Sequence, residues 1–151
     1  MLSIITITYQ AEAYIERTLQ SLAEQGHREE IEYIVIDGGS KDGTLGILNQ
    51  SPIKIDQLIS EKDQGIYDAM NKGLRIAKGD YVLFLNAGDT FFDANSLSFL
   101  LKDLASQPDV VYGDAQFVNL AGQAIGLRSE VTPHRLPEQA SWKDFKFGMV
   151  I

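Results

Sequence analysis

The sequence predicts an α/β domain built on a mainly parallel sheet that is flanked by helices. Two observations support this prediction. Short runs of apolar and β-branched residues, as at 2–8 and 31–36, are typical of strands buried on both faces, and such strands belong to parallel sheets. Segments with apolar residues three or four positions apart alternate with these runs, which indicates amphipathic helices between the strands.

The elements follow one another in a regular order. Strands are expected at 2–8, 31–36, 55–60, 81–85 and 109–113, and those at 2–8, 31–36 and 81–85 are expected to be buried. Helices are expected at 11–25, 44–50, 66–77 and 96–105. Gly26 and Gly79 follow two of these helices, as glycine commonly does. Asp93 or Asn95 is the expected cap of the last one.

The pattern changes after Gly113. Residues 115–119 and 123–128 flank a turn at 120–122, which predicts a β-hairpin. Residues 132–146 show no clear period and are expected to form a loop. We therefore expect two regions, 1–113 and 114–151. Because the last residues, 147–151, are apolar and carry no polar tail, the second region is expected to be truncated.

Composition excludes several classes of function. A length of 151 residues with 44% hydrophobic content fits one compact domain. The absence of cysteine excludes a thiolate site, and a formal charge of −8 argues against a nucleic-acid partner. The first residues do not form a signal peptide, and no apolar window approaches the roughly 20 residues of a membrane span. The expectation is a soluble, cytoplasmic domain.

Candidate chemistry lies after the strands, because ligands of open parallel sheets bind beyond the carboxyl ends. The turn at 38–43 lacks the lysine of a P-loop, and Ser40 stands where the dinucleotide fingerprint needs glycine. Gly39 likewise breaks the calcium-loop pattern. A diphosphate would then be neutralised mainly by Mg²⁺ or Mn²⁺ at Asp89, although a cap before Thr90 is an equal alternative from spacing alone.

Three segments in this order resemble the family 2 glycosyltransferases, whose fold is the Rossmann-like GT-A fold. They are residues 3–9 (SIITITY), 36–44 (IDGGSKDGT) and 79–89 (GDYVLFLNAGD). Residues 61–73 (EKDQGIYDAMNKG) resemble the family's segment before the metal motif, and the likeness spans about 2–113. The metal motif of the family is Asp-x-Asp. In this chain Asn86 stands at the first aspartate position and Gly88 at the second, so both carboxylates are missing.

The resemblance implies a binding site for a nucleotide-sugar donor. The implied binding residues are Thr8, Tyr9, Glu12, Asp37, Lys62, Asp68, Asn71, Asn86 and Ala87, with Asp89 as the single strong metal ligand. Thr8, Tyr9, Glu12 and Asp37 would hold uracil and ribose, while Asp68 and Asn71 would contact sugar hydroxyls.

Some alternatives stay open for these residues. Tyr9 can instead pack, and Thr8 can simply favour a strand. Because Met70 stands where many members carry arginine, either Lys62 or Lys72 could meet the phosphates, or both could be solvated surface charges. Ser40 and Asp42 are expected to shape their turn, and Asn71 can instead stabilise a helix end.

The implied reaction is an inverting, metal-dependent transfer from a nucleotide sugar, most simply a UDP-sugar, to a saccharide or lipid-linked acceptor. Polysaccharide biosynthesis is the expected setting. Residues 114–151 would begin the acceptor side, and a missing C-terminal part could bring the enzyme to the inner face of the membrane. The catalytic base is expected after Ile151, because Asp144 matches no family motif.

Two other functions remain open. One is a noncatalytic nucleotide-binding module. The other is a sugar nucleotidyltransferase, which residues 9–12 disfavour because they are acidic and contain no glycine. His27 and His134 are expected to be solvated surface residues. Trp142, Phe145 and Phe147 are expected to pack, with an acceptor site as the alternative.

Overall fold

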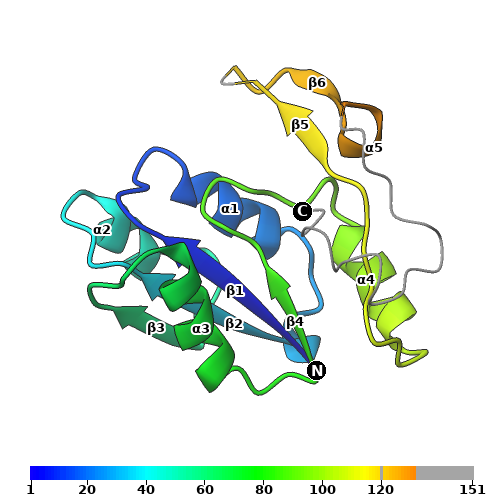
Figure 1. Cartoon of the computed structure of the whole chain (residues 1–151), viewed down its shortest axis with the longest axis horizontal. Coiled ribbons are helices and arrows are strands. Elements are labelled where there is room, and N and C mark those ends of the chain that lie inside the picture. Colours follow the sequence, from blue (N-terminus) through cyan, green and yellow to red (C-terminus); the bar gives the residue numbers. More distant parts are fainter. Residues whose placement is uncertain (120, 132–151) are drawn as a thin grey trace. The chain divides into compact units, whose positions relative to one another are not determined.

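The computed structural model describes residues 1–119 and 121–131 of the chain (Figure 1). The chain forms two compact units, Met1–Pro108 and Asp109–Ile151. Leu120 and residues 132–151 lie outside the described residues. The expectations for the loop at 132–146, the apolar run at 147–151, His134, Trp142, Asp144, Phe145 and Phe147 fall there.

The first unit contains a four-stranded parallel sheet in the order β3-β2-β1-β4 (Figure 1). The strands are β1 (Leu2–Thr8), β2 (Ile31–Asp37), β3 (Gln57–Ser60) and β4 (Tyr81–Phe84). Every residue of β1 and β2 is buried, as their unbroken apolar runs predict. The parallel α/β fold expected from the sequence is confirmed.

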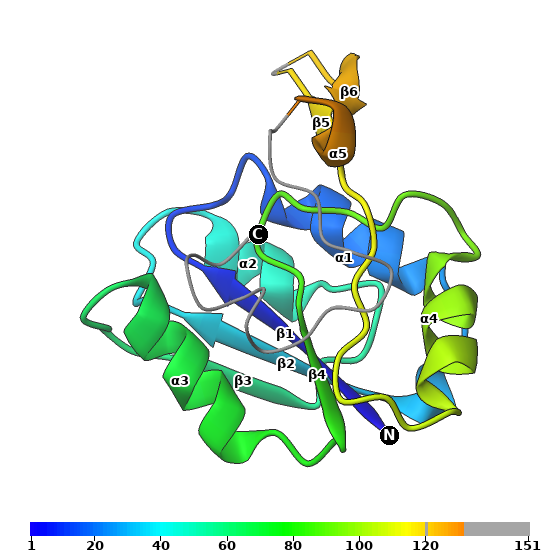
Figure 2. The same ribbon diagram turned by 45° about the vertical axis from the view of Figure 1, so that its right-hand side comes forward.

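Helices cover both faces of this sheet (Figure 2). They are α1 (Ile15–Ala23), α2 (Thr44–Asn49), α3 (Ile66–Ile76) and α4 (Ser96–Leu104), with a short 3-10 helix, η1, at Arg28–Glu30. Side chains of α1, α2 and α4 pack with Leu2, Ile4 and Tyr33 on one face. On the other face, Ala69 of α3 packs with Ile5, Ile7, Ile34 and Ile36. The strand alternation therefore separates two hydrophobic clusters.

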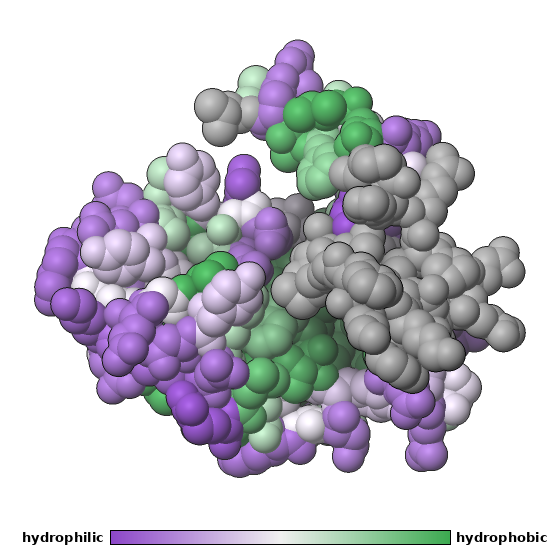
Figure 3. All heavy atoms as spheres, in the orientation of Figure 1, coloured by the Kyte–Doolittle hydropathy of each residue, from purple (hydrophilic) through white to green (hydrophobic). Residues whose placement is uncertain are grey.

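The strand expectations are wrong in two places. β4 is only partly buried, and Val82 is 39% exposed, because β4 has a single neighbour, β1, among the described strands. Figure 3 shows an apolar surface over this strand. Residues 109–113 form no strand, and Val110 is 57% exposed. Their short apolar run has no partner strand among the described residues, and without ladder hydrogen bonds a strand does not form.

Helix boundaries differ from expectation where tertiary contacts intervene. α1 begins at Ile15 and not at residue 11, because the Ala11 backbone N–H donates to Thr44 Oγ1 and anchors the preceding turn on α2. Of the two expected caps of α4, Asp93 makes the side-chain hydrogen bonds. Asn95 makes no side-chain capping bond, while the Asp93 carboxylate accepts from the Asn95 backbone N–H and the Ser96 hydroxyl.

The second unit contains the expected hairpin. Strands β5 (Gln116–Val118) and β6 (Ala124–Leu127) pair antiparallel with a bulge between Phe117 and Val118, and α5 (Arg128–Val131) follows. The Asn119 side-chain oxygen accepts hydrogen bonds from the backbone N–H groups of Ala121 and Gln123, which closes the turn. In the part of the chain that the structure describes, no helix has the length and apolar character needed to cross a membrane.

Candidate nucleotide-sugar site

The carboxyl ends of three strands place polar side chains in one row. The register pairs Thr8 of β1 with Asp37 of β2, and Asp37 with Ser60 of β3. All three are the last residues of their strands. A ligand lying across this edge would therefore meet residues from the loops that follow β1, β2 and β3.

Asp37 is fully buried and strongly hydrogen-bonded. Its Oδ2 accepts from the backbone N–H groups of Gly39 and Ser40 and from the Ser60 hydroxyl at 2.6 Å, and its Oδ1 accepts from the Ser40 hydroxyl at 2.5 Å. The Ser40 hydroxyl oxygen also accepts from the Gln10 backbone N–H. Asp37 thus ties the loops after β1, β2 and β3 together.

The loop after β4 continues the sheet pairing into the expected metal motif. The backbone N–H groups of Leu85 and Ala87 donate to the carbonyl oxygens of Ile5 and Ile7. The Asp89 N–H then donates to the Asn86 carbonyl oxygen at 2.9 Å and closes a tight turn. Gly88 has a φ of +100°, which glycine adopts without strain and an aspartate would not.

Two buried hydroxyls fix this turn from beneath. Thr18 of α1 accepts from the Gly88 N–H and donates to the Asp89 carbonyl oxygen, both at 2.8 Å. Thr6 of β1 donates to the Leu85 carbonyl oxygen and accepts from the Tyr33 hydroxyl. Burial raises the pKa of Tyr33 to about 12, so this hydroxyl stays a donor. The turn is held by the sheet and by α1 together.

Two buried oxygens at this edge have no hydrogen-bond partner among the described residues, namely Thr8 Oγ1 and Asn86 Oδ1. Thr8 ends β1, and Asn86 follows the neighbouring strand β4. An unsatisfied buried polar atom costs about 1–3 kcal/mol. Unsatisfied buried polar atoms at the carboxyl ends of adjacent strands are typical of a site that a polar ligand completes.

Asp89 and Arg17 lie close together above the turn. Partial burial raises the pKa of the Asp89 carboxyl, while the hydrogen bond from Asn86 and the nearby charge of Arg17 lower it. Residue 89 nevertheless presents surface to solvent, so its carboxylate can reach a ligand.

The loop after β1 contains the other predicted residues of the base site. Tyr9 is 60% exposed, and its ring packs beside Gly38, where an added Cβ would lie 3.2 Å from the ring. Glu12 Oε2 accepts from the Gly43 N–H, and Asp42 Oδ2 accepts from the Glu12 N–H. Asp42 also bonds to Thr44, so it shapes its turn, as expected.

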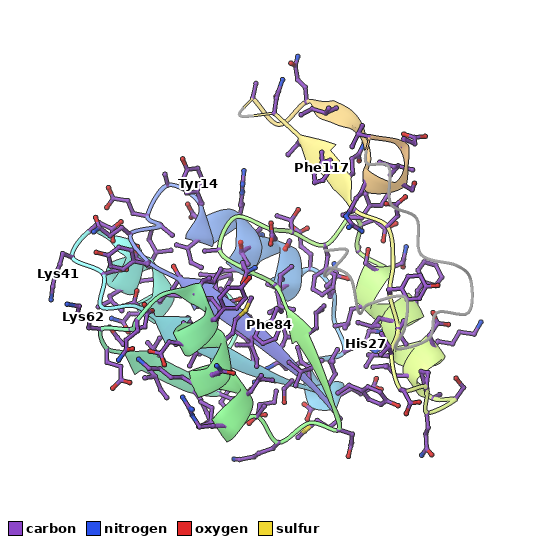
Figure 4. All side chains as sticks on the ribbon, viewed as in Figure 1. Tyr14, His27, Lys41, Lys62, Phe84 and Phe117 are labelled. Carbon is purple, nitrogen blue, oxygen red and sulfur yellow. The ribbon has the colours of Figure 1, made fainter. Side chains whose placement is uncertain are left out.

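The predicted cationic residues have different environments. Lys72 Nζ lies 3.0 Å from Glu61 and 3.5 Å from Asp68, and its hydrogen bond to Glu61 raises its pKa. Lys62 is exposed, and no described residue forms an ion pair with it. Figure 4 shows Lys41 and Lys62 extending outward from the loops after β2 and β3. Lys62 is therefore the freer of the two lysines considered for the phosphates.

Asp68 and Asn71 lie one turn apart on α3. The Asp68 carboxylate accepts from the Gln64 N–H, which lowers its pKa first, and the charge of Lys72 lowers it further. Asn71 is exposed. Of the ten predicted residues, the structure brings Thr8, Asp37, Asn86 and Ala87 together at the ends of adjacent strands.

A family model described as Glycosyl transferase family 2 matches residues 3–150. The chain belongs to this family. The resemblance to family 2 glycosyltransferases seen in the three sequence segments is confirmed. The GT-A fold implied by that resemblance is also confirmed, since structures of similar glycosyltransferases have this fold.

Named glycosyltransferases are similar to part of the chain. A PGL/p-HBAD biosynthesis glycosyltransferase of Mycobacterium tuberculosis is 39% identical over 119 residues, covering 76% of this chain and 46% of that protein. TuaG of Bacillus subtilis, provisionally named a teichuronic acid biosynthesis glycosyltransferase, is 42% identical over 93 residues, covering 59% of this chain and 36% of that protein. The chain spans less than half the length of these relatives.

Two solved glycosyltransferases show the same arrangement of the chain. S. aureus TarS, crystallised with UDP-GlcNAc, has a TM-score of 0.62 and 29% identity, covering 70% of this chain and 31% of TarS. The mannosyltransferase PcManGT from Pyrobaculum calidifontis, in complex with GDP-Man and Mn²⁺, has a TM-score of 0.63 and 26% identity, covering 78% of this chain and 35% of that one.

The residues present suit a divalent cation whose coordination shell is completed by a bound phosphate. Among the described residues, no three acidic or histidine side chains gather into a preformed site. Asp89 and the unpartnered Asn86 Oδ1 nevertheless provide two oxygen ligands in one turn. Mg²⁺ and Mn²⁺ bind well to one or two such groups when phosphate and water supply the rest.

Sequence reasoning missed three residues of this edge. Ser60 is the partner of Asp37, and Asp63 lies against Gly38, where an added Cβ would be 2.7 Å from its Oδ2. Arg17 lies over Gly88. The end of β3 could have indicated Ser60, but nothing local indicates Arg17. His27 is exposed, as expected, yet it contacts Glu30 and Ser98 at 2.8 and 2.6 Å.

Proposed function

We propose that this protein transfers a sugar from a nucleotide-sugar donor to a saccharide or lipid-linked acceptor. The observation that carries the proposal is that two buried oxygens have no partner among the described residues: Thr8 Oγ1 at the end of β1 and Asn86 Oδ1 in the turn after β4 that also contains Asp89. A nucleotide diphosphate with its cation would satisfy such atoms. Membership of the family supports the same reaction class.

A UDP-sugar is the proposed donor. The support is that TarS was crystallised with UDP-GlcNAc. Because PcManGT was crystallised with GDP-Man, GDP is the nucleotide to compare with UDP. The exposed ring of Tyr9 can stack on a base, and Asp37 Oδ1 has one internal donor and can accept an imide N–H. Glu12 borders the ribose in this proposal.

The sugar and the diphosphate extend over the neighbouring loops. Asp68 and Asn71 are proposed to accept and donate hydrogen bonds to sugar hydroxyls, and Lys62 to pair with a phosphate oxygen. Asn86, Ala87 and Asp89 hold the diphosphate end of the donor. A bound Mn²⁺ or Mg²⁺ would offset the negative charge of the departing nucleoside diphosphate.

The relatives' names support the proposed acceptor and setting. Those names refer to PGL/p-HBAD and teichuronic acid biosynthesis, so we propose a cell-surface saccharide or glycolipid as the product class. The reaction is proposed to be inverting and to take place in the cytoplasm at the inner face of the membrane. Residues 1–113 would bind the donor, and 114–151 would begin the acceptor side. No described residue is proposed as the catalytic base.

The test is a calorimetric titration of the chain with UDP and with GDP, in Mn²⁺ and in EDTA. Wild-type protein is expected to bind UDP more tightly in Mn²⁺. Asp89→Asn should lose about tenfold or more of the affinity in Mn²⁺, because a charged ligand becomes neutral. The matched control is Asp103→Asn, which changes an exposed carboxylate on α4.

Equal affinities of wild type and Asp89→Asn in Mn²⁺ would refute the metal role of Asp89. Failure of the wild-type chain to bind either nucleotide would refute the donor site. Release of UDP from a UDP-sugar distinguishes an enzyme from a noncatalytic nucleotide-binding module.

A further inference from the structure

Arg17 of α1 occupies the space above Gly88. A Cβ added to Gly88 would lie 3.1 Å from Arg17 Nη2 and 3.6 Å from Tyr14 Cβ. Arg17 is in the first turn of α1, while Gly88 lies between Asn86 and Asp89 in the turn after β4. The volume that a side chain would occupy at residue 88 is therefore filled by a guanidinium group.

The guanidinium of Arg17 is positioned near the Asp89 carboxylate, whose pKa its charge lowers, but forms no ion pair within 4.0 Å among the described residues. It lies over the ring of Tyr14, 5.6 Å from the ring centroid. Tyr14 directly precedes α1 (Figure 4). Among residues 1–119 and 121–131, no carboxylate pairs with the guanidinium and no acceptor takes its hydrogen bonds. An arginine has five N–H donors in a planar fork, and a ligand phosphate is the kind of group that such donors bind.

The turn below Arg17 is built to keep this arrangement. Gly88 needs its φ of +100°, and Thr18 fixes the backbone on both sides of the Gly88–Asp89 peptide. Thr18 and Arg17 are consecutive residues of α1, so the contact that fixes the turn also fixes the distance to the guanidinium. The positively charged side chain of Arg17 therefore lies beside Gly88, the position at which the sequence has no second carboxylate.

We propose that Arg17 binds the diphosphate of the nucleotide donor directly, through charge-assisted hydrogen bonds above Gly88. This inference rests on the proposed function, since it needs a diphosphate at the Asn86–Asp89 turn. Arginine suits the task because its fork matches two phosphate oxygens at once. Arg17 and Asp89 then bind the diphosphate in different ways. The arginine contacts the phosphate with or without metal, whereas Asp89 contacts the phosphate only through the metal.

The experiment is a titration of the full chain with UDP, GDP, uridine and inorganic pyrophosphate, each in Mn²⁺ and in EDTA. The variants are Arg17→Gln and Arg17→Lys. Arg75→Gln is the matched control, because it removes an exposed arginine from the last turn of α3. Arg17→Gln is expected to weaken UDP about tenfold in both conditions and to leave uridine unchanged.

Arg17→Lys should recover only part of the loss, because a lysine keeps the charge and loses the fork. Pyrophosphate binding should decrease together with UDP binding, and the melting temperatures should match wild type. Unchanged UDP affinity in Arg17→Gln overturns this inference alone. An equal loss of uridine, or a loss confined to Mn²⁺, also overturns it. A wild-type chain that binds neither nucleotide overturns the proposed function and this inference with it.

Discussion

Thr18 illustrates, at the scale of single residues, how one hydroxyl can determine a loop on another element. It is fully buried, accepts from the Gly88 N–H and donates to the Asp89 carbonyl oxygen. Thr18→Val keeps the shape and removes both bonds, so it should lower the free energy of unfolding by about 1–3 kcal/mol. Urea unfolding measures this change.

Thr18→Ser is the matched control, since serine keeps the hydroxyl. We expect it to lose less stability than Thr18→Val and to keep UDP affinity, whereas Thr18→Val should weaken UDP binding by displacing Asp89. If the valine and serine variants were equally stable, the two hydrogen bonds would not be what holds the turn.

Glu32 gives a second prediction for a single residue, at the opposite edge of the sheet. It is 6% exposed and accepts from the Ser3 hydroxyl, the Gln57 amide and the Lys78 N–H. Burial alone would raise the pKa of Glu32, but these hydrogen bonds outweigh it and lower the pKa below 4.5. Its carboxylate therefore stabilises the folded state at neutral pH.

The sign of the pH dependence follows from this lowered pKa. The folded state binds the proton more weakly than the unfolded state, so the contribution is complete above 4.5 and is lost as pH falls through the folded pKa. Glu32→Gln should cost about 1–3 kcal/mol at neutral pH and flatten the acid loss of stability. Glu29→Gln, on the exposed η1, serves as control. An unchanged acid profile in Glu32→Gln would contradict this account.

At the scale of elements, two helical glycines should respond oppositely to alanine. In α3, a Cβ on Gly73 would lie 2.7 Å from Ile5 Cγ2 of β1, while in α2 a Cβ on Gly46 would meet nothing within 4 Å. Alanine gains about 1 kcal/mol of helix propensity at either position. Gly73→Ala should still destabilise the protein, because forcing a methyl into a packed interface costs about 1–3 kcal/mol.

Gly46→Ala is therefore expected to raise the melting temperature and Gly73→Ala to lower it. Thermal unfolding of the two variants beside wild type measures the difference. Stabilisation by both substitutions would mean that α3 can move away from β1 at little cost.

At the scale of the whole molecule, the first unit should fold and bind nucleotide by itself. In the described part of the chain, all residues of both hydrophobic clusters lie at or before Leu104. The polypeptide 1–108 should therefore unfold cooperatively and bind UDP as the 1–151 chain does. Calorimetry and urea unfolding of both chains test this expectation. An unfolded 1–108 chain would show that later residues complete the core.

The sequence by itself determined the order of strands and helices, the parallel sheet and the family. Apolar runs at 2–8 and 31–36 predict strands because a strand that is buried on both faces has apolar residues at nearly every position. The same pattern failed at 109–113, since a strand needs a partner that local sequence does not reveal. Asp89 could be proposed from its motif, although its position above a turn held by Thr18 could not.

Only the tertiary structure decided which of the predicted polar residues already have partners within the protein. Asp37 and Lys72 are bonded within the protein, while Thr8 and Asn86 have buried oxygens without partners in the described chain. It also brought Arg17 over Gly88, across more than half of the first unit's sequence. Spacing along the chain sets periodicity and therefore local structure. Hydrogen-bond satisfaction and charge proximity depend on distances in space, which only the folded sheet and its helices define.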